Sequence, residues 1–189
     1  YTGKPSIFLS GQAGPGVTNT VTSMAQAKAA FSPVINLAGA ISSEHKGLDA
    51  FQEVDQVRLM QPVSKKVFEV KDIESIPLIL NEGFKTAVEP RMGPVHIDLP
   101  RDVLGHSSEF EPPQKYQIAK LPNADEMSIQ KSVKLLSESK KPVILIGAGI
   151  KNYGSEGTEA VISLAELLNA PITASPGHND SIPSNHPLY

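Results

Sequence analysis

The sequence of 189 residues contains no cysteine and no tryptophan, and only 5% of it is aromatic. The lack of cysteine excludes a disulfide framework, a thiolate nucleophile and a cysteine-based zinc site. Apolar runs are short, and none approaches the roughly 18–20 residues of a membrane span. The net charge of −3, without clusters of lysine or arginine, gives no electrostatic footprint for nucleic acid or a membrane surface. We therefore expect a soluble globular protein of a reducing, cytoplasmic compartment.

Proline and glycine are abundant, with 16 and 14 residues, and they separate short apolar segments. Up to residue 100, strand-like and helix-like segments alternate in the order β-α-β-α-β-α-β. This order predicts an α/β fold with helices packed on a mainly parallel sheet. The expected strands are 7–9, 34–38, 63–70 and 94–100, and the expected helices are 17–31, 49–60 and 73–88.

In residues 101–124 the alternation of strand-like and helix-like segments stops. We interpret this segment as a surface linker, because it is too long for an ordinary loop. A helix capped by Asp125 or Ser128 follows and is expected to run to Ser139. A half-built sheet with an open edge is an unlikely independent domain, so we expect that the chain is truncated or that its missing strands come from elsewhere. The remaining expected elements are a strand at 142–146, a helix at 158–169 and a strand at 171–175.

The most informative stretch is Ser6–Asn19, in which a short apolar strand meets a glycine-rich turn and then a helix-like segment near Val17. Such a turn brings unobstructed backbone N–H groups to the start of a helix, where the dipole is positive. Pro15 stiffens the turn, and Gly14 and Gly16 allow backbone angles or approaches that a Cβ would forbid. The residues alone leave two interpretations open, a cofactor site and a tight connection of an α/β domain.

Other patterns are weaker. Gly147-Ala148-Gly149 follows an expected strand, but the third glycine of a dinucleotide fingerprint is missing. Asp49 and Glu53 lie four apart on an expected helix, which suits either acid–base chemistry or a solvated helix start. The histidines are interpreted as surface or satisfied core residues: His45, His96, His106, His178 and His186.

Several motifs occur together in a recognisable order: Gly14-Pro-Gly-Val-Thr-Asn19, Asp49-Ala-Phe-Gln-Glu53, Arg91-Met-Gly-Pro-Val95, Asp98-Leu-Pro-Arg-Asp-Val103, Lys140-Lys-Pro-Val143 with Gly147-Ala-Gly149, and His186-Pro-Leu-Tyr189. With them the sequence resembles thiamine diphosphate-dependent enzymes of the acetolactate synthase type over nearly its whole length. The resemblance implies the later part of a pyrimidine-binding domain at 1–105, a linker at 106–124 and the first half of a Rossmann-like central domain at 125–189.

The resemblance also implies roles for individual residues. Pro15, between Gly14 and Gly16, would pack against the cofactor pyrimidine, and Asn19 would reach its polar edge. Phe51 and Gln52 would face the substrate side. Arg91 matches an arginine that contacts FAD in flavin-containing members, although a surface ion pair is the alternative. The central domain would approach its nucleotide through three residues, Gly147, Ala148 and Gly149.

Some expected parts of the family are missing from the sequence. The activating glutamate would lie upstream of Tyr1, and the Mg²⁺ ligands would lie beyond Tyr189, so we expect neither a catalytic residue nor a metal ligand within the chain. Ala40 stands where acetolactate synthases have a glutamine after glycine. The run Ser175–Ser181 replaces a Thr-Leu-Met-Gly run that is common in acetolactate synthases. His178-Asn-Asp-Ser181, together with Pro183 and His186-Pro-Leu188, looks more like sulfoacetaldehyde acetyltransferases.

The function that the resemblance implies is decarboxylation of a 2-oxo acid followed by carboligation, as in branched-chain amino acid biosynthesis. Its cofactors would be thiamine diphosphate and Mg²⁺, with FAD as a candidate, and the intact enzyme would be a homodimer or tetramer. The alternatives are a sulfoacetaldehyde acetyltransferase, a 2-hydroxyacyl-CoA lyase and a non-catalytic cofactor-binding or subunit-interaction fragment. The chain alone is expected to be inactive.

Overall fold

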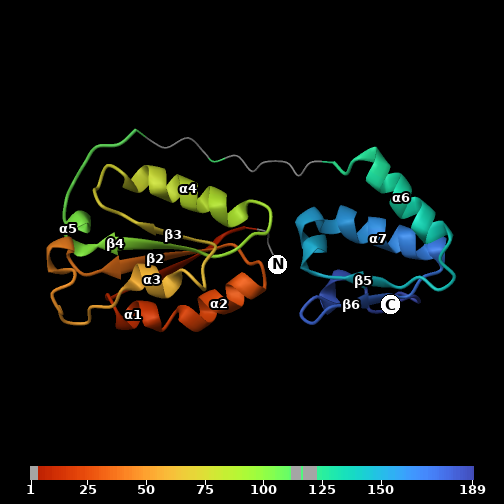
Figure 1. Cartoon of the computed structure of the whole chain (residues 1–189), viewed down its shortest axis with the longest axis horizontal. Helices are drawn as coiled ribbons and strands as arrows, with labels where there is room; N and C mark the ends of the chain where they lie inside the picture. Colours follow the sequence, from red (N-terminus) through yellow and green to blue (C-terminus); the bar gives the residue numbers. More distant parts are fainter. Residues whose placement is uncertain (1–3, 112–115, 117–122) are drawn as a thin grey trace. The chain divides into compact units, whose positions relative to one another are not determined.

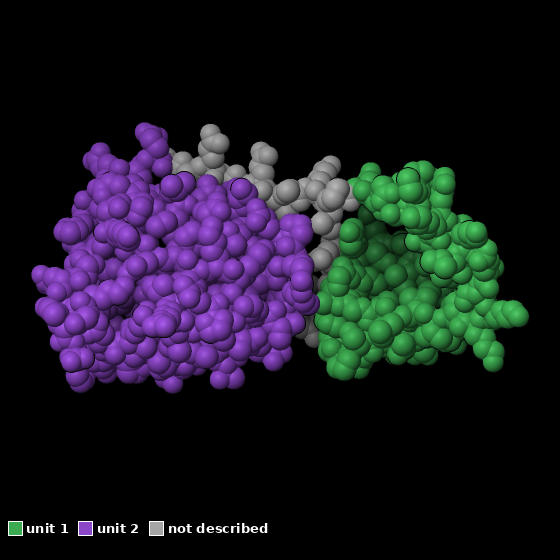
Figure 2. All heavy atoms as spheres, in the orientation of Figure 1, with its two compact units in different colours: residues 1–3, 121–189 green, residues 4–120 purple. Residues whose placement is uncertain are grey.

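The computed structural model describes residues 4–111, 116 and 123–189 (Figure 1). These residues form two compact units, one within 4–120 and the other within 121–189 (Figure 2). They are called the N-terminal unit and the C-terminal unit below. Of the linker expected at 106–124, residues 112–115 and 117–122 lie outside the described residues.

The N-terminal unit contains a four-stranded sheet in the order β1-β2-β4-β3. Every pairing is parallel, and Ile35 on β2 lies opposite Val95 on β4. These parallel pairings confirm the prediction of an α/β fold with a parallel sheet. Parallel neighbours need a crossover connection, and this is usually a helix. The strands are β1 (Ser6–Ser10), β2 (Val34–Ala40), β3 (Lys66–Glu69) and β4 (Val95–Pro100).

Helices cover both faces of this sheet (Figure 1). On one face, Val17 and Met24 pack with Ala38 of β2. On the other, Ala87 packs with Ile35 and Ile97 of the two central strands. The side chains of a strand alternate between its faces, so β2 contributes to both clusters. The helices are α1 (Pro15–Thr18), α2 (Val21–Ala29), α3 (Gln56–Met60), α4 (Ile76–Val88) and α5 (Arg101–Leu104), with a 3-10 helix, η1 (Ser43–His45).

Two of the expected helices have different bounds in the structure. The helix expected at 17–31 is divided into α1 and α2, and Thr20 Oγ1 at the break donates to the Val17 carbonyl (2.8 Å). The helix expected at 73–88 begins at Ile76, because Pro77 fits only its first turn and the Asp72 carboxylate accepts the N–H of Ser75 (2.8 Å).

The prediction of a helix over 49–60 is wrong in its first half. Asp49 and Gln52 have positive φ angles of 54° and 63°, and α3 begins only after Asp55, whose carboxylate accepts the N–H of Arg58 (3.0 Å). Glu53 accepts the N–H of Ala50 (3.0 Å), a side-chain contact that competes with helical hydrogen bonding. Asp49 and Glu53 therefore do not share a helix face.

The C-terminal unit has a two-stranded parallel sheet of β5 (Ile144–Ile146) and β6 (Ile172–Ala174). Its core centres on Ile146, Ala165 and Ile172. Asp125 is the N-cap of the first helix, where it accepts the N–H of Ser128 (2.9 Å). The helix expected at 158–169 starts earlier because a 3-10 turn runs directly into it. The remaining elements are α6 (Glu126–Ser137), η2 (Ala148–Tyr153), α7 (Gly154–Leu168) and η3 (Asn179–Ser181).

Candidate cofactor site

The glycine turn, residues 11–16, joins β1 to α1 at the carboxyl edge of the sheet. Gly14 has a φ of 63°, and a Cβ on it would lie 2.1 Å from the carbonyl oxygen of Gln52. A Cβ on Gly16 would lie 1.9 Å from the carbonyl oxygen of Gly11. Both glycines are therefore required by close backbone contacts within the protein itself.

The outer surface of the glycine turn is formed by other residues. Pro15 and Asn19 are exposed, whereas Gly14 and Val17 are buried beneath them. Because α1 is a single turn of Pro15–Thr18, its dipole is a small one. The turn thus offers a ligand the flat face of a proline ring and a side-chain amide, rather than a long helix terminus.

A second segment, the Phe51 loop (residues 46–54), lies against the glycine turn. Gln12 Nε2 donates to Gln52 Oε1 (2.6 Å), so the two segments are joined by side chains as well as by the Gly14 contact. Phe51 is 86% exposed on this loop. Gln12, Asp49 and Gln52 all have positive φ angles, and strained backbone of this kind gathers at functional sites.

Charged side chains fix the Phe51 loop. The Glu53 carboxylate accepts the backbone N–H groups of Gly47 and Ala50, which hold the pKa of Glu53 below its usual range. Lys46 pairs with Glu69 on β3, and this hydrogen bond raises the pKa of Lys46. The loop is therefore tied both to itself and to the sheet.

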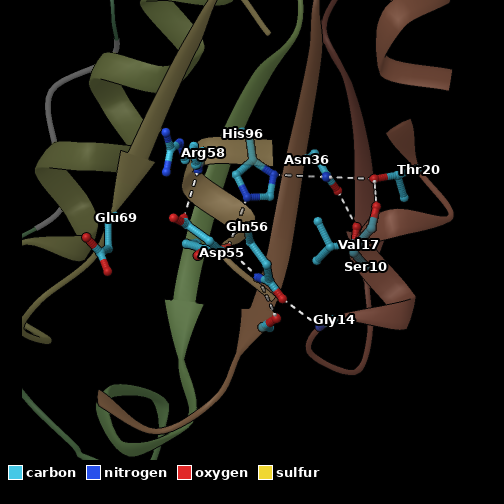
Figure 3. A network of polar contacts seen from close by, with 12 residues as sticks. Ser10, Gly14, Val17, Thr20, Asn36, Asp55, Gln56, Arg58, Glu69 and His96 are labelled. Atoms are coloured by element: carbon cyan, nitrogen blue, oxygen red, sulfur yellow. Dashed lines mark hydrogen bonds and ion pairs between the residues drawn. The ribbon is translucent and has the colours of Figure 1, made fainter. Parts of the chain in front are cut away.

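The glycine turn is bonded to a buried polar network of Ser10, Asn36, Gln56, His96 and Asp98. Figure 3 labels the first four of these residues. Gly14 N–H donates to Gln56 Oε1 (2.6 Å), and Gln56 Nε2 donates to Asp98 Oδ1 (2.6 Å). His96 Nε2 lies 3.0 Å from the same oxygen. The network thus runs from the turn into the centre of the sheet.

Analysis of the sequence missed these residues as part of the site. One signal was available, because His96 and Asp98 are two apart in an expected strand and must share a face, and Asn36 interrupts an apolar strand. The structure does show His96 as a satisfied core histidine, fully buried and bonded through both ring nitrogens. The pairing with Gln56 depends on α3 and could not be read from periodicity.

Arg91 lies apart from the glycine turn. It precedes β4, whereas the glycine turn follows β1. In a parallel sheet these two positions lie at opposite ends of the strands, the first at their amino ends and the second at their carboxyl ends. The guanidinium lies over the ring of Phe31, with 5.1 Å between Cζ and the ring centroid. Arg91 lines a pocket of about 570 Å³ together with Lys28, Lys65, the ring of Phe31 and several apolar residues.

Lys65 is held in this pocket by backbone carbonyls. Its Nζ donates to the oxygens of Thr86 (2.6 Å) and Glu89 (3.1 Å). Burial lowers the pKa of Lys65. The negative charge of Glu89 acts in the opposite direction and raises the pKa of Lys65.

Gly147, Ala148 and Gly149 belong to the C-terminal unit, at the end of β5. A Cβ on Gly147 would meet Ser175 Oγ at 3.6 Å, an ordinary contact, and a Cβ on Gly149 would meet no described heavy atom within 4 Å. Ala148 begins η2. This turn is therefore not shaped by packing constraints as the glycine turn is.

Comparison with known proteins gives two matches to families. Residues 1–59 match "Thiamine pyrophosphate enzyme, N-terminal TPP binding domain", and residues 129–189 match "Thiamine pyrophosphate enzyme, central domain". The chain belongs to the thiamine pyrophosphate enzyme family. The glycine turn, Phe51 and Gln52 fall in the first match, and Gly147–Gly149 fall in the second.

Relatives within this thiamine pyrophosphate enzyme family are acetolactate synthase large subunits. The chain is 39% identical to a probable large subunit from Methanocaldococcus jannaschii, over 93% of this chain and 30% of that protein. It is 36% identical to a probable large subunit from Methanococcus aeolicus, over 98% and 32%. It is 34% identical to the isozyme 1 large subunit of Escherichia coli K12, also over 98% and 32%. The chain thus spans about a third of the length of these relatives.

The geometry fits a thiamine pyrophosphate enzyme at the glycine turn. An exposed proline ring, an exposed amide and a neighbouring aromatic side chain are suited to an aromatic ring with polar edges. In the described part of the chain, histidine, aspartate and glutamate do not gather in groups of three that could hold a metal ion. Among the described helices, none has both the length and the apolar character of a membrane span.

Proposed function

We propose that this chain is the cofactor-holding part of a thiamine diphosphate-dependent enzyme that decarboxylates a 2-oxo acid and joins the product to a second carbonyl compound, as acetolactate synthase does. The glycine turn carries the proposal, because it lies in the match to the TPP binding domain and presents Pro15 and Asn19 to solvent. The similarity to acetolactate synthase large subunits supports the choice of reaction.

In this proposal the residues of the chain bind and orient. Thiamine diphosphate, when bound, supplies the electron sink for decarboxylation. The ring of Pro15 would support the pyrimidine, and the Asn19 amide would bond its polar edge. Gln52 would be positioned by Gln12, and the exposed Phe51 ring would shield the substrate from water.

The division of the chain is part of the same proposal. Residues 1–105 would be the later part of the pyrimidine-binding domain, 106–124 a linker and 125–189 the first half of the central domain. The activating glutamate and the Mg²⁺ ligands would come from outside these residues, and the intact enzyme would be a cytoplasmic homodimer or tetramer. The 189 residues alone would then lack carboligase activity.

Titration of the intact protein with thiamine diphosphate tests the site. We expect Asn19→Ala to weaken binding about tenfold, the effect of one lost hydrogen bond, without changing the unfolding midpoint. Asn185→Ala, a second exposed asparagine, is the matched control and should bind like the wild type. Equal affinity of Asn19→Ala and the wild type would remove Asn19 from the site.

Product analysis tests the reaction. With thiamine diphosphate, Mg²⁺ and pyruvate, the intact protein should release acetolactate. His178–Ser181, with Pro183 and His186-Pro-Leu188, favours a second candidate, a sulfoacetaldehyde acetyltransferase, and a 2-hydroxyacyl-CoA lyase is a further alternative. Turnover of sulfoacetaldehyde or a 2-hydroxyacyl-CoA without acetolactate would replace the first proposal. Cofactor binding without any turnover would favour a non-catalytic cofactor-binding or subunit-interaction part.

A flavin is proposed separately, at the pocket of Arg91. The Arg91 guanidinium suits a phosphate and the Phe31 ring suits an aromatic ring, which supports the assignment by resemblance. By the same resemblance, Gly147, Ala148 and Gly149 of the C-terminal unit are proposed as nucleotide-binding residues. We expect the purified intact protein to show flavin absorbance and Arg91→Met to lose it while binding of thiamine diphosphate persists. A colourless wild-type protein that FAD cannot reconstitute would contradict this assignment.

A further inference from the structure

The buried polar network holds the glycine turn and α1 from both ends. At the start, the Gly14 N–H donates to Gln56 Oε1 (2.6 Å). At the end, Thr20 Oγ1 donates to the Val17 carbonyl (2.8 Å) and receives a hydrogen bond from Asn36 Nδ2 (3.2 Å). A single set of side chains on the central strands and α3 therefore fixes the segment that carries Pro15 and Asn19 (Figure 3).

Gln56 can hold Gly14 in only one orientation of its amide. The oxygen must face the Gly14 N–H, so the nitrogen must donate, and it does so to Asp98 Oδ1 (2.6 Å) and the Gly39 carbonyl (3.2 Å). A reversed amide would place two donors together at Gly14 and two acceptors together at Asp98. In a side chain that is only 3% exposed, water cannot relieve such a mismatch.

The strands set this orientation through His96. Ser10 Oγ donates to Asn36 Oδ1, so Asn36 Nδ2 donates to His96 Nδ1 (3.1 Å). The His96 proton is then on Nε2 and is donated to Asp98 Oδ1 (3.0 Å). Asp98 accepts from both His96 and Gln56, and every hydrogen bond in the network has a consistent direction.

We propose that Gln56 is a positioning residue for the cofactor, which fixes the Gly14 end of the glycine turn while Asp98, held by His96, sets the direction of the Gln56 amide. The inference rests on the proposed function, because positioning matters only if the turn holds thiamine diphosphate. A buried polar network costs desolvation that an apolar core avoids. Here the network gives a defined geometry to the glycine turn and to α1, which is only a single helical turn.

The first test measures the Gly14 amide directly. Hydrogen–deuterium exchange of the intact protein, with fragmentation of peptides covering residues 11–17, resolves this amide without any ligand. We expect Gln56→Met to lower its protection about tenfold, the effect of losing ~1.4 kcal/mol of hydrogen bonding, while the β4 amides keep theirs. Gln61→Met, an exposed glutamine just after α3, is the control and should match the wild type.

A second pair of variants separates orientation from packing. Asp98→Asn retains an oxygen that can accept from Gln56 and His96, whereas Asp98→Leu has a similar size and accepts nothing. We expect Gly14 protection to be retained in the first and lost in the second, although neither change touches Gly14. This pair decides the question even if Gln56→Met fails to fold. Equal protection in Asp98→Asn and Asp98→Leu, or unchanged protection in Gln56→Met, would overturn the inference.

Titration with thiamine diphosphate then separates the two proposals. We expect Gln56→Met to raise the dissociation constant at least tenfold, and Gln61→Met to leave it unchanged. A wild-type protein that does not bind thiamine diphosphate overturns the proposed function, while the exchange data still decide whether Gln56 holds the turn. Wild-type binding with equal affinity in Gln56→Met overturns the positioning role.

Discussion

Gly14 combines a backbone angle and a contact that only glycine tolerates. Its φ of 63° is unfavourable for residues with a Cβ, and that Cβ would lie 2.1 Å from the Gln52 carbonyl oxygen. The glycine turn and the Phe51 loop can therefore approach each other only while position 14 lacks a side chain. At the residue scale, this contact decides the shape of the candidate site.

We expect Gly14→Ala to lower the free energy of unfolding by about 2–4 kcal/mol, because the strain and the collision add. Gly11→Ala is the matched control in the same turn, since its Cβ would meet no described heavy atom within 4 Å, and it should stay within about 0.5 kcal/mol of the wild type. Urea unfolding followed by circular dichroism measures both. Similar losses for the two variants would contradict the role of the Gln52 contact.

The hydrogen bonds that the Glu53 carboxylate accepts within the Phe51 loop should depend on pH. The N–H groups of Gly47 and then Ala50 lower its pKa, so the loop contacts are present above the usual pKa of 4.5 and are lost as pH falls through the lower folded value. We expect the amide proton shifts of Gly47 and Ala50 to titrate below pH 4.5 in NMR spectra. Glu53→Gln should abolish this titration, whereas Glu44→Gln, at an exposed position, should preserve it. A midpoint at or above 4.5 would be inconsistent with these contacts.

At the scale of elements, β2 and β4 are joined by side chains as well as by their backbones. Asn36 on β2 is fully buried and bonds His96 on β4 (3.1 Å). The neighbouring residues Ile35 of β2 and Val95 and Ile97 of β4 are apolar and fully buried, so this hydrogen bond lies in a largely apolar part of the sheet. The stability of the central pair therefore depends on an intact network.

We expect Asn36→Ala to lower the free energy of unfolding by about 2–4 kcal/mol, because it leaves a cavity and removes the partner of buried His96 Nδ1 and Ser10 Oγ. Asn123→Ala, at an exposed position, should change it by less than about 0.5 kcal/mol. Thermal and urea unfolding provide the measurement. A loss below about 1 kcal/mol would show that water or rearranged partners satisfy these groups.

For the whole molecule, each unit has an apolar core of its own. Ile97 is fully buried in the N-terminal unit, and Ile172 is 4% exposed in the C-terminal unit. Units with separate cores can unfold in separate transitions, so a single free energy of unfolding need not describe the chain.

We expect Ile172→Ala to destabilise the C-terminal unit by about 2–5 kcal/mol and to leave the β2 and β4 amides protected. Ile97→Ala should do the converse, exposing the sheet amides and sparing those of α7. Native-state hydrogen exchange distinguishes the two units. Loss of protection in both units from either variant would mean that they unfold together.

The sequence by itself determined the order of elements up to β4, the parallel sheet and the glycine-rich turn, because apolar periodicity, proline and glycine act over short distances along the chain. The tertiary structure decided what lies around that turn. Glu53 and Asp55 accept hydrogen bonds from nearby N–H groups, and α3 therefore begins only at Gln56. The Gln56 side chain then bonds Gly14 and Asp98, which are both distant from it in the sequence. Contacts between distant residues leave no periodic signal, so these parts of the site could not be predicted from the sequence.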